Sequence, residues 1–382
     1  MYQVMIRNGT VIDPANGLHQ RADVAIADGK IAGVGVFDAE ATMEIDAEGC
    51  IVTPGLIDHH AHLYPLAGIG IPAQAMCFAS GVTTAVDAGS TGCATFSRYI
   101  PYLKQEKLTI RAYLNVCSTG LDSLPAAMED VRPEAYDRDA IAQMFQQYGQ
   151  YLLGLKLRTS KAVVKELGYE PLRQTVALAD QLGVSVMVHC TDPPGSMDEL
   201  LDCLRPGDVL THMYMNKGST VLDREGRVSQ AARAARERGV LFEAADARAH
   251  FSFQVSQQAL AQDFLPDFIA TDLTRLSMNL RPTAFSMANQ LAKYHFLGIP
   301  LDELFACCTS RPSRFMGLEG QAGCLSQGAW GDVAVFRLLD RAVEFGDRTY
   351  HDPDCHLRQG NVCLRPVLTV KRGEVVFRDI AF

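Results

Sequence analysis

The sequence predicts an α/β protein whose central part is a (β/α)8 TIM barrel and whose two ends form a small β unit. Two observations predict this fold. Through the middle of the chain, eight apolar, strand-like runs alternate with helix-like stretches, which is the pattern of a closed barrel. At both ends, short strand-like segments occur with Asn-Gly or Asp-Gly pairs between them. With 382 residues, 48% of them hydrophobic, the chain can bury a core of this size.

The two ends of the chain have the same strand-and-turn character. Residues 2–13 contain an Asn-Gly pair and residues 22–35 an Asp-Gly pair, and both pairs are hairpin signals. The segments 331–338 and 366–379 also read as strands. We therefore expect one small β domain from residues 1–52 plus 320–382, and a barrel domain from residues 53–319.

The expected barrel strands and helices follow each other in order along the chain. The strand-like runs are 50–58, 82–89, 110–118, 152–160, 184–190, 208–214, 240–246 and 268–273. Helix-like stretches include 139–151, 171–183, 196–204, 228–239, 253–264 and 283–298. An open, doubly wound sheet is the alternative, but it would need a Gly-x-Gly-x-x-Gly turn after an early strand, and none stands there.

Composition argues against several classes of partner. The formal net charge is −9 and no basic run stands out, which disfavours nucleic acid and anionic membranes. No stretch approaches the ~20 apolar residues of a membrane helix, and the first residues do not resemble a signal peptide. The eleven cysteines include no Cys-x-x-Cys pair, so we expect buried thiols in a reducing, cytoplasmic setting.

Ionisable residues stand at or near the ends of the expected strands, where a barrel fold brings side chains together on one face. Residues i and i+2 of a strand share a face, so His60 and His62 can bind one ion while His59 faces away. Imidazole suits zinc, and an aspartate adds an oxygen ligand. A single histidine of this kind is more often a hydrogen-bonded core residue. Taken together, the ionisable residues at the strand ends predict a metal site. Its candidate ligands are His60, His62, Lys156, His189, His212 and Asp272.

Lys156 is unusual in this set because an ammonium group and a metal cation repel each other. It can point away from the site and reach solvent. Alternatively, carbon dioxide converts it to a carbamate whose two oxygens bridge two ions. The residues alone leave both possibilities open.

Several stretches together resemble the amidohydrolase superfamily, its dihydroorotase-like branch and, within that branch, the deacetylase group. They are "PGLIDHHAH", "GVTTAVDAGSTG", "GLKLRTS", "PLRQTVALADQLGVSVMVHCTDPP", "LRPGDVLTHMYMNKG", "LPDFIATDL" and "GDVAVF". The resemblance covers nearly the whole chain. It implies a small β-sandwich formed by both termini and two divalent ions, usually zinc. His60, His62 and Asp272 would hold the first ion, His189 and His212 the second, and Lys156, as N6-carboxylysine, would bridge them.

The resemblance also implies a reaction. A hydroxide generated by the ions would attack an acyl carbon, and Asp272 would act as the general base. The expected substrate is a small acylated hydroxy acid or amino acid. The acyl group that it loses is expected to be an acetyl group. Its carboxylate would need basic partners, for which Arg158, Arg275 and Arg281 are the candidates, with Thr274 nearby.

Three positions depart from relatives in this branch. Dihydroorotases carry an arginine shortly after the His-x-His pair, where Leu63 and Tyr64 stand here. The deacetylase group has a Gly-His-Gly turn that is absent from residues 246–253, where only His250 occurs, and we expect His250 to serve packing or surface roles. Thr274 replaces a histidine of that group.

Three alternative functions remain open at this point: a cyclic-amide hydrolase, a deaminase, or a binding protein on the same fold. The complete ligand set disfavours the binding protein, and Lys156 disfavours a deaminase, because deaminases of the superfamily tend to use one ion without the lysine bridge. A homo-oligomer is possible.

Overall fold

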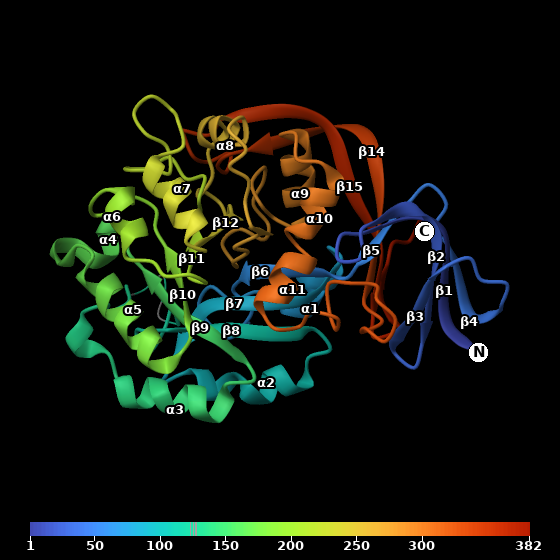
Figure 1. Ribbon diagram of the computed structural model, residues 1–382, viewed down its shortest axis with the longest axis horizontal. Helices are drawn as coiled ribbons and strands as arrows, with labels where there is room; N and C mark the ends of the chain where they lie inside the picture. The colour runs from blue at the N-terminus through green and yellow to red at the C-terminus, as the bar shows by residue number, and fades with distance from the viewer. Residues whose placement is uncertain (123, 125, 127) are drawn as a thin grey trace.

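The computed structural model describes residues 1–122, 124, 126 and 128–382, and these contain two eight-stranded sheets. In the first sheet, all neighbouring strands are parallel and follow chain order. A parallel bridge between Ala61 and Leu273 joins its two ends, so the sheet is a nearly closed barrel (Figure 1). The predicted (β/α)8 architecture is confirmed. Its strands are β6 (Leu56–Ala61), β7 (Val82–Gly92), β8 (Thr109–Asn115), β9 (Leu152–Arg158), β10 (Ser185–His189), β11 (Val209–Thr211), β12 (Leu241–Ala245) and β13 (Phe268–Ala270).

Helices surround the barrel, and serine side chains fix where several of them begin. Ser196, Ser229, Ser252 and Ser286 each accept a hydrogen bond from a backbone N–H in the first turn of a helix. None of the described helices combines the length and the apolar character needed to cross a bilayer. The helices are α1 (Ala73–Phe78), α2 (Ile100–Gln105), α3 (Arg138–Tyr148), α4 (Lys161–Val164), α5 (Glu170–Leu182), α6 (Met197–Asp202), α7 (Gln230–Glu237), α8 (Phe253–Leu260), α9 (Met287–Phe296), α10 (Leu301–Ala306) and α11 (Ser310–Phe315).

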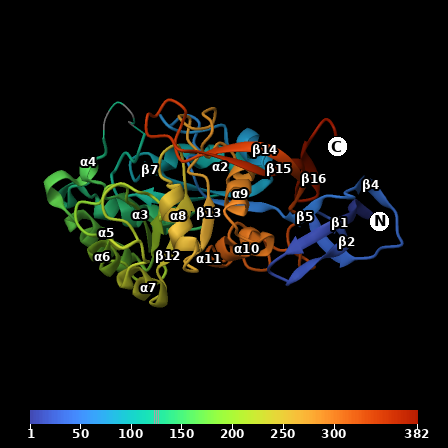
Figure 2. The ribbon, with the colours of Figure 1, turned by 90° about the horizontal axis from the view of Figure 1, so that it is seen from above.

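The second sheet combines both ends of the chain. Its order is β16-β15-β14-β5-β1-β2-β3, with β4 also beside β1. The antiparallel pairing of β5 with β14 joins the N-terminal strands to the C-terminal ones. From this sheet the long β14–β15 hairpin extends over α9 (Figure 2). The strands are β1 (Tyr2–Asp13), β2 (Leu18–Ala27), β3 (Lys30–Gly35), β4 (Ala41–Asp46), β5 (Ile51–Pro54), β14 (Val333–Gly346), β15 (Leu357–Lys371) and β16 (Glu374–Arg378).

The run 50–58, expected to be one barrel strand, is divided between the two sheets. β5 pairs with β1 and β14, whereas β6 pairs with β7 in the barrel. Gly55 lies at the crossing, where an added Cβ would lie 2.2 Å from Thr83 Oγ1. The chain therefore leaves the terminal sheet at Gly55, three residues beyond the expected domain boundary. The division into two domains itself stays a prediction.

The two N-terminal hairpin signals have different outcomes. Asp28 and Gly29 have φ values of 50° and 71° and form the turn between β2 and β3, as predicted. Asn8 also has a positive φ, 65°, but β1 continues through it, and its pairing with β2 shifts register between Ile6 and Gly9. The Asn-Gly pair thus forms an irregularity inside a strand and not a hairpin turn.

Apolar side chains fill the barrel interior toward the amino ends of its strands. A buried cluster joins residues from β6, β7, β8, β10, β11 and β13 with residues that follow α11. Packed interiors of this kind close a barrel at its amino end and leave the carboxyl ends of the strands to form a site. The cluster includes Ile57, Val86, Ala88, Tyr113, Met187, Val209 and Phe268.

Candidate metal centre

The six predicted ligands converge at the carboxyl ends of the barrel strands. A cavity of about 290 Å³ opens there, and His60, His62, Lys156, His189 and Asp272 line it. The sixth residue, His212, is buried directly behind the ring of His189. Strand order therefore brings together residues that are up to 212 positions apart in the sequence.

Asp272 lies at the centre of this group. Its Oδ1 is 3.4 Å from His60 Nε2 and 3.3 Å from His62 Nε2, and its Oδ2 is 3.8 Å from His212 Nε2. Burial by itself would raise the pKa of Asp272, but the neighbouring histidines outweigh it and hold the pKa well below its usual range. Asp272 is consequently a carboxylate with histidine nitrogens on both of its oxygens. His60, His212 and Asp272 form one of two clusters able to hold a metal ion among the described residues.

Asp272 and His212 both have left-handed backbone conformations, with φ values of 50° and 63°. His212 directly follows the last residue of β11 and Asp272 lies two residues beyond β13, where the chain leaves the sheet. Non-glycine residues in this region cost about 1–3 kcal/mol and persist where the surroundings hold them in place. The conformation turns both side chains toward the barrel axis and the other ligands.

Backbone and side-chain acceptors orient the imidazole rings. His212 Nδ1 lies 2.6 Å from the carbonyl oxygen of Ala245, and His60 Nδ1 lies 2.7 Å from Glu243 Oε1. Since a carbonyl or carboxylate oxygen only accepts, the Nδ1–H of each ring donates. Nε2 of His60 and Nε2 of His212 then keep their lone pairs toward Asp272 and the cavity.

His62 is oriented through a serine hydroxyl. Ser90 Oγ donates to Asp87 Oδ2 at 2.7 Å, and it lies 2.8 Å from His62 Nδ1. Because the hydroxyl proton is directed at Asp87, the oxygen accepts from His62 Nδ1–H. Asp87 is itself held by the backbone N–H groups of Leu63 and Ser90. The ring of His62 thus also presents Nε2 to Asp272.

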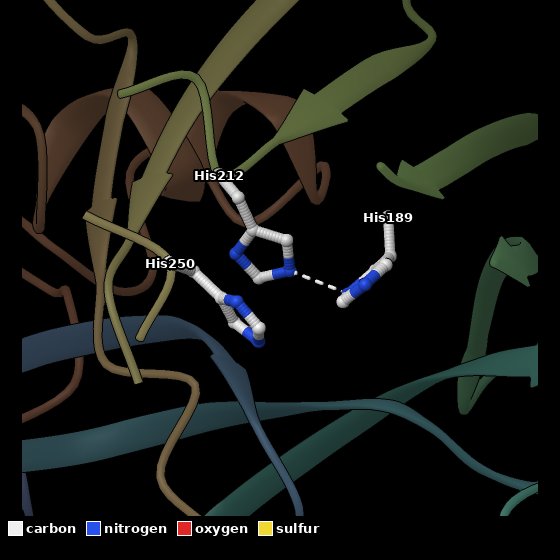
Figure 3. Close-up of side chains that lie close together, drawn as sticks. All are labelled: His189, His212 and His250. Atoms are coloured by element: carbon white, nitrogen blue, oxygen red, sulfur yellow. Dashed lines mark hydrogen bonds between the residues drawn. The ribbon is translucent and has the colours of Figure 1, made fainter. Parts of the chain in front are cut away.

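His189, His212 and His250 form the second cluster that could hold an ion (Figure 3). His212 Nε2 lies 2.8 Å from His189 Nδ1, and the ring of His250 lies 4.4 Å from that of His212, centre to centre. Burial lowers the pKa of His189 and of His212 well below the usual histidine value, and lowers that of His250 to about 4. All three rings are therefore neutral at neutral pH, which is the form that binds metals.

Lys156 is fully enclosed beside these rings. Its Nζ is buried and has no hydrogen-bond partner among the described residues. Burial lowers the pKa of Lys156 to about 8, against the attraction of Asp272 and Glu243. An added Cβ on Gly89, whose φ is +82°, would lie 2.6 Å from both Cβ and Cγ of Lys156, so the lysine needs a glycine beside it. The lysine does not turn away to solvent.

Two of the four predicted substrate contacts line the cavity. They are Arg158, whose Nε lies 3.2 Å from Oε1 of the buried Glu129, and Thr274. Arg275 instead donates to the carbonyl oxygens of Pro65 and Gly70 and holds that loop. Arg281 lines a different cavity, between α9 and the β14–β15 hairpin, where its guanidinium lies 4.2 Å from the ring centre of Phe285. Arg275 and Arg281, predicted as substrate contacts, are therefore not among the residues that line this cavity.

Four residues of the centre were not predicted in their observed places. His250, expected to be a packing or surface residue, lines the cavity, with its Nε2 3.7 Å from Asp272 Oδ2. Arg248, two residues earlier, lines it as well. His59 does not face away from the centre but shares the carboxylate of Glu243 with His60. The one sequence signal for Glu243 is its position as an acidic residue in the middle of the apolar run 240–246, which ends in Asp246.

The chain is similar to several known proteins. Residues 51–376 match the family model described as "Amidohydrolase family". The chain is 33% identical over 352 residues to a deacetylase of Agrobacterium fabrum, covering 90% of this chain and 85% of the relative. A deacetylase of Enterococcus faecalis is 25% identical over 381 residues, 98% of this chain and 99% of the relative.

Solved structures agree on the fold. One described as a dihydroorotase has a TM-score of 0.86 at 28% identity, over 97% of this chain and 98% of its own. Another, described as an adenine deaminase, has a TM-score of 0.89 at 24% identity, over 99% and 100% of the two chains. At that identity the second likeness concerns the fold alone.

Proposed function

Since the chain belongs to the amidohydrolase family and is a hydrolase, we propose that it is a metal-dependent deacetylase acting on a small, carboxylate-bearing ester or amide. The observation that carries this proposal is the single cavity in which His60, His62, Lys156, His189 and Asp272 meet. Two relatives named as deacetylases, at 33% and 25% identity along most of the chain, support the acyl group as the one removed.

The residues fit a pair of divalent ions. Neutral imidazole nitrogens and a carboxylate are the donors that zinc prefers, and both gather around Asp272. His60, His62 and Asp272 would hold one ion, and His189 and His212 the other. Lys156 Nζ is buried and has no hydrogen-bond partner in the described part of the chain, and a bound metal ion would explain its position. Carbamylation would replace one N–H bond by a bond to the carbon of CO₂, release a proton, and supply an oxygen to each ion.

Divalent ions bound here would polarise the acyl carbonyl as Lewis acids and lower the pKa of a water molecule. The chain's own part begins with Asp272, whose carboxylate faces the cavity and accepts the proton of the attacking water. Asp272 then returns that proton to the oxygen or nitrogen of the leaving group, so that acetate and the free alcohol or amine are the products. No serine or cysteine nucleophile is required.

The cavity walls favour an amphipathic acid as the substrate. Its lining includes the basic residues Arg158, Arg248 and Lys217, of which Lys217 pairs with Asp192, and the apolar residues Ile69, Leu121, Leu124, Val163 and Leu276. Arginine binds carboxylates through paired N–H groups, so the arginines would hold the acid group. The apolar residues would accept a hydrocarbon substituent and reduce access of bulk water to the reacting bond.

A cyclic-amide hydrolase is the second candidate, favoured by the 28% identity to a solved dihydroorotase. The residues after His62 disfavour that substrate class. Leu63 and Tyr64 are fully buried, and the ring of Tyr64 stacks on that of Tyr99 at 4.3 Å. Neither position therefore supplies a cation that could bind the carboxylate of a cyclic-amide substrate.

A hydrolysis screen tests the proposal. Purified protein supplied with zinc and bicarbonate is assayed for acetate release from O-acetyl hydroxy acids and N-acetyl amino acids of both hands. We expect release that the Lys156→Ala variant loses together with bound metal, as measured by elemental analysis. Release of ring-opened products from cyclic amides, without acetate from any acylated acid, would favour the second candidate. Equal metal content and equal activity in wild type and Lys156→Ala would refute the bridging lysine.

A further inference from the structure

A buried glutamate connects two adjacent histidines beneath the metal centre. Glu243, on β12, lies 2.6 Å through Oε2 from His59 Nδ1 and 2.7 Å through Oε1 from His60 Nδ1. All three side chains are at most 1% exposed. Because the carboxylate only accepts, both imidazoles donate to it. Of these three residues only His60 is a candidate metal ligand, so Glu243 and His59 have no part in the reaction proposed above.

An irregularity in β6 makes this arrangement possible. Asp58 pairs with Ala85 and Ala61 with Asp87, so three steps along β6 oppose two steps along β7. Such a bulge breaks strict alternation and lets consecutive side chains approach one acceptor. His59 then lies in the packed barrel interior, with ring-centre distances of 4.5 Å to Phe268 and 5.2 Å to Phe315.

The two hydrogen bonds of Glu243 have different consequences. The bond to His59 lies in the apolar interior, where an unpaired carboxylate oxygen or ring nitrogen would cost free energy of folding. The His60 bond fixes the proton on Nδ1, so the Nε2 lone pair points to Asp272, 3.4 Å away. A carboxylate behind a ligating histidine fixes its tautomer and its orientation and raises its basicity as a ligand. Thr211 Oγ1, 3.1 Å from the same Nδ1, is a weaker, neutral alternative.

We infer that Glu243 is a positioning residue that sets the tautomer and the affinity of His60 toward the first metal ion, while its bond to His59 anchors the carboxylate in the barrel. This inference rests on the proposed function, because it concerns a metal ligand of that site. It assigns two separate effects to one side chain: metal affinity through His60, and stability through His59.

Cobalt(II) titration of the full-length protein, followed by visible absorption, tests this assignment. Glu243→Met replaces the carboxylate, with its two acceptor oxygens, by an apolar side chain of similar length. We expect the dissociation constant of one of the two cobalt-binding steps to rise about 10–100-fold and the absorption spectrum of that step to change. Glu243→Gln keeps one acceptor oxygen and should lose less affinity. Asp208→Asn, at an equally buried carboxylate directly before β11, serves as control and should lower the melting temperature without changing either step.

His59→Phe separates the two effects. Phenylalanine keeps an aromatic ring beside Phe268 and Phe315 and leaves the Glu243–His60 bond, so both cobalt steps should match wild type. The melting temperature should fall because the bonds of the His59 ring to Glu243 and to the Tyr113 hydroxyl are lost. Unchanged cobalt affinity in Glu243→Gln and, where it folds, in Glu243→Met would overturn the inference. Loss of cobalt affinity in His59→Phe equal to that of Glu243→Met would overturn the division of roles. A wild type that binds no cobalt would refute the proposed function instead.

Discussion

His212 Nε2 and His189 Nδ1 face each other across 2.8 Å at the carboxyl ends of two neighbouring strands. Both rings are buried, and the Nδ1–H of His212 donates a hydrogen bond to the carbonyl oxygen of Ala245 on β12. This pair offers two nitrogens to one ion. We expect His212→Ala to reduce the bound metal from two ions to one per chain, as measured by elemental analysis after dialysis. His295→Ala, in a histidine of α9 bound to the carbonyl of Ile299, should retain both ions; two ions in His212→Ala would contradict the ligand assignment.

Gly89 provides the space that Lys156 occupies. An alanine there would adopt a positive φ and place its Cβ 2.6 Å from the lysine stem. We expect Gly89→Ala to lower the free energy of unfolding by about 1–3 kcal/mol through backbone strain and also to lower metal content by displacing Lys156. Gly207→Ala is the matched control, since Gly207 has φ +84° and nothing within 4 Å of an added Cβ. Equal metal content in the two variants would show that Lys156 tolerates the contact.

His250 completes the second histidine cluster, with its Nε2 3.7 Å from Asp272 Oδ2. We expect His250→Ala to weaken retention of the second ion about tenfold, the lower end of the effect of losing a supporting contact at a metal site. Zinc competition against a chromophoric chelator measures the affinity. If affinity and turnover both equal those of wild type, His250 is a packing residue, as its sequence context alone had predicted.

Arg158 should bind the acid group of the substrate. A hydrogen bond to a charged group contributes about 1.5–3 kcal/mol, so Arg158→Ala should raise KM for an acylated acid roughly 10–100-fold. A neutral ester of the same acid should show little change, because it carries no carboxylate. Arg281→Ala is the control, since Arg281 lines a separate cavity. A similar loss with both substrates would mean that Arg158 serves the structure through Glu129.

A buried ion pair at the terminal sheet is hydrogen-bonded to a barrel strand. Lys371 Nζ lies 2.6 Å from Asp332 Oδ2 and donates to Thr109 Oγ1 of β8 at 2.9 Å. Lys371→Met leaves Asp332 buried without its cation, and we expect a loss of about 3–5 kcal/mol in the free energy of unfolding by denaturant. Adding Asp332→Asn should recover part of this loss. Lys107→Met, which breaks a pair more than half exposed on both sides, should change stability by less than about 1 kcal/mol.

The sequence predicts that the candidate ligands lie together, and they do, because their convergence depends only on strand order. His60, His189 and Asp272 come from different parts of the chain, yet parallel strands in a barrel bring their ends to one face. No detailed contact is needed for that inference. The hydrophobic period identifies the strands, and the barrel places their last residues together.

The contacts that sequence missed depend on local backbone geometry. His59 faces Glu243 because of a bulge in β6, which no residue pattern announces. His250 reaches Asp272 because Ala247 adopts a φ of 44° and His250 N–H bonds to the carbonyl of Asp246, closing a tight turn. Arg281 was misplaced because the path of the chain after Asp272 leads it to α9 and the β14–β15 hairpin. Loops depend on tertiary contacts that strand periodicity does not encode.

The pairing of β5 with β14 affects how this chain can fold as it is synthesised. Pro54 and Thr53 find their partners Val333 and Ala334 about 280 residues later in the chain. At about 5–20 residues per second, a ribosome needs on the order of 14–56 s to supply them. Until then β5 has an open edge, and β6 likewise waits for the bridge to Leu273. Such long-range pairings make folding slow and leave strand edges exposed, so expression at lower temperature should raise the soluble yield.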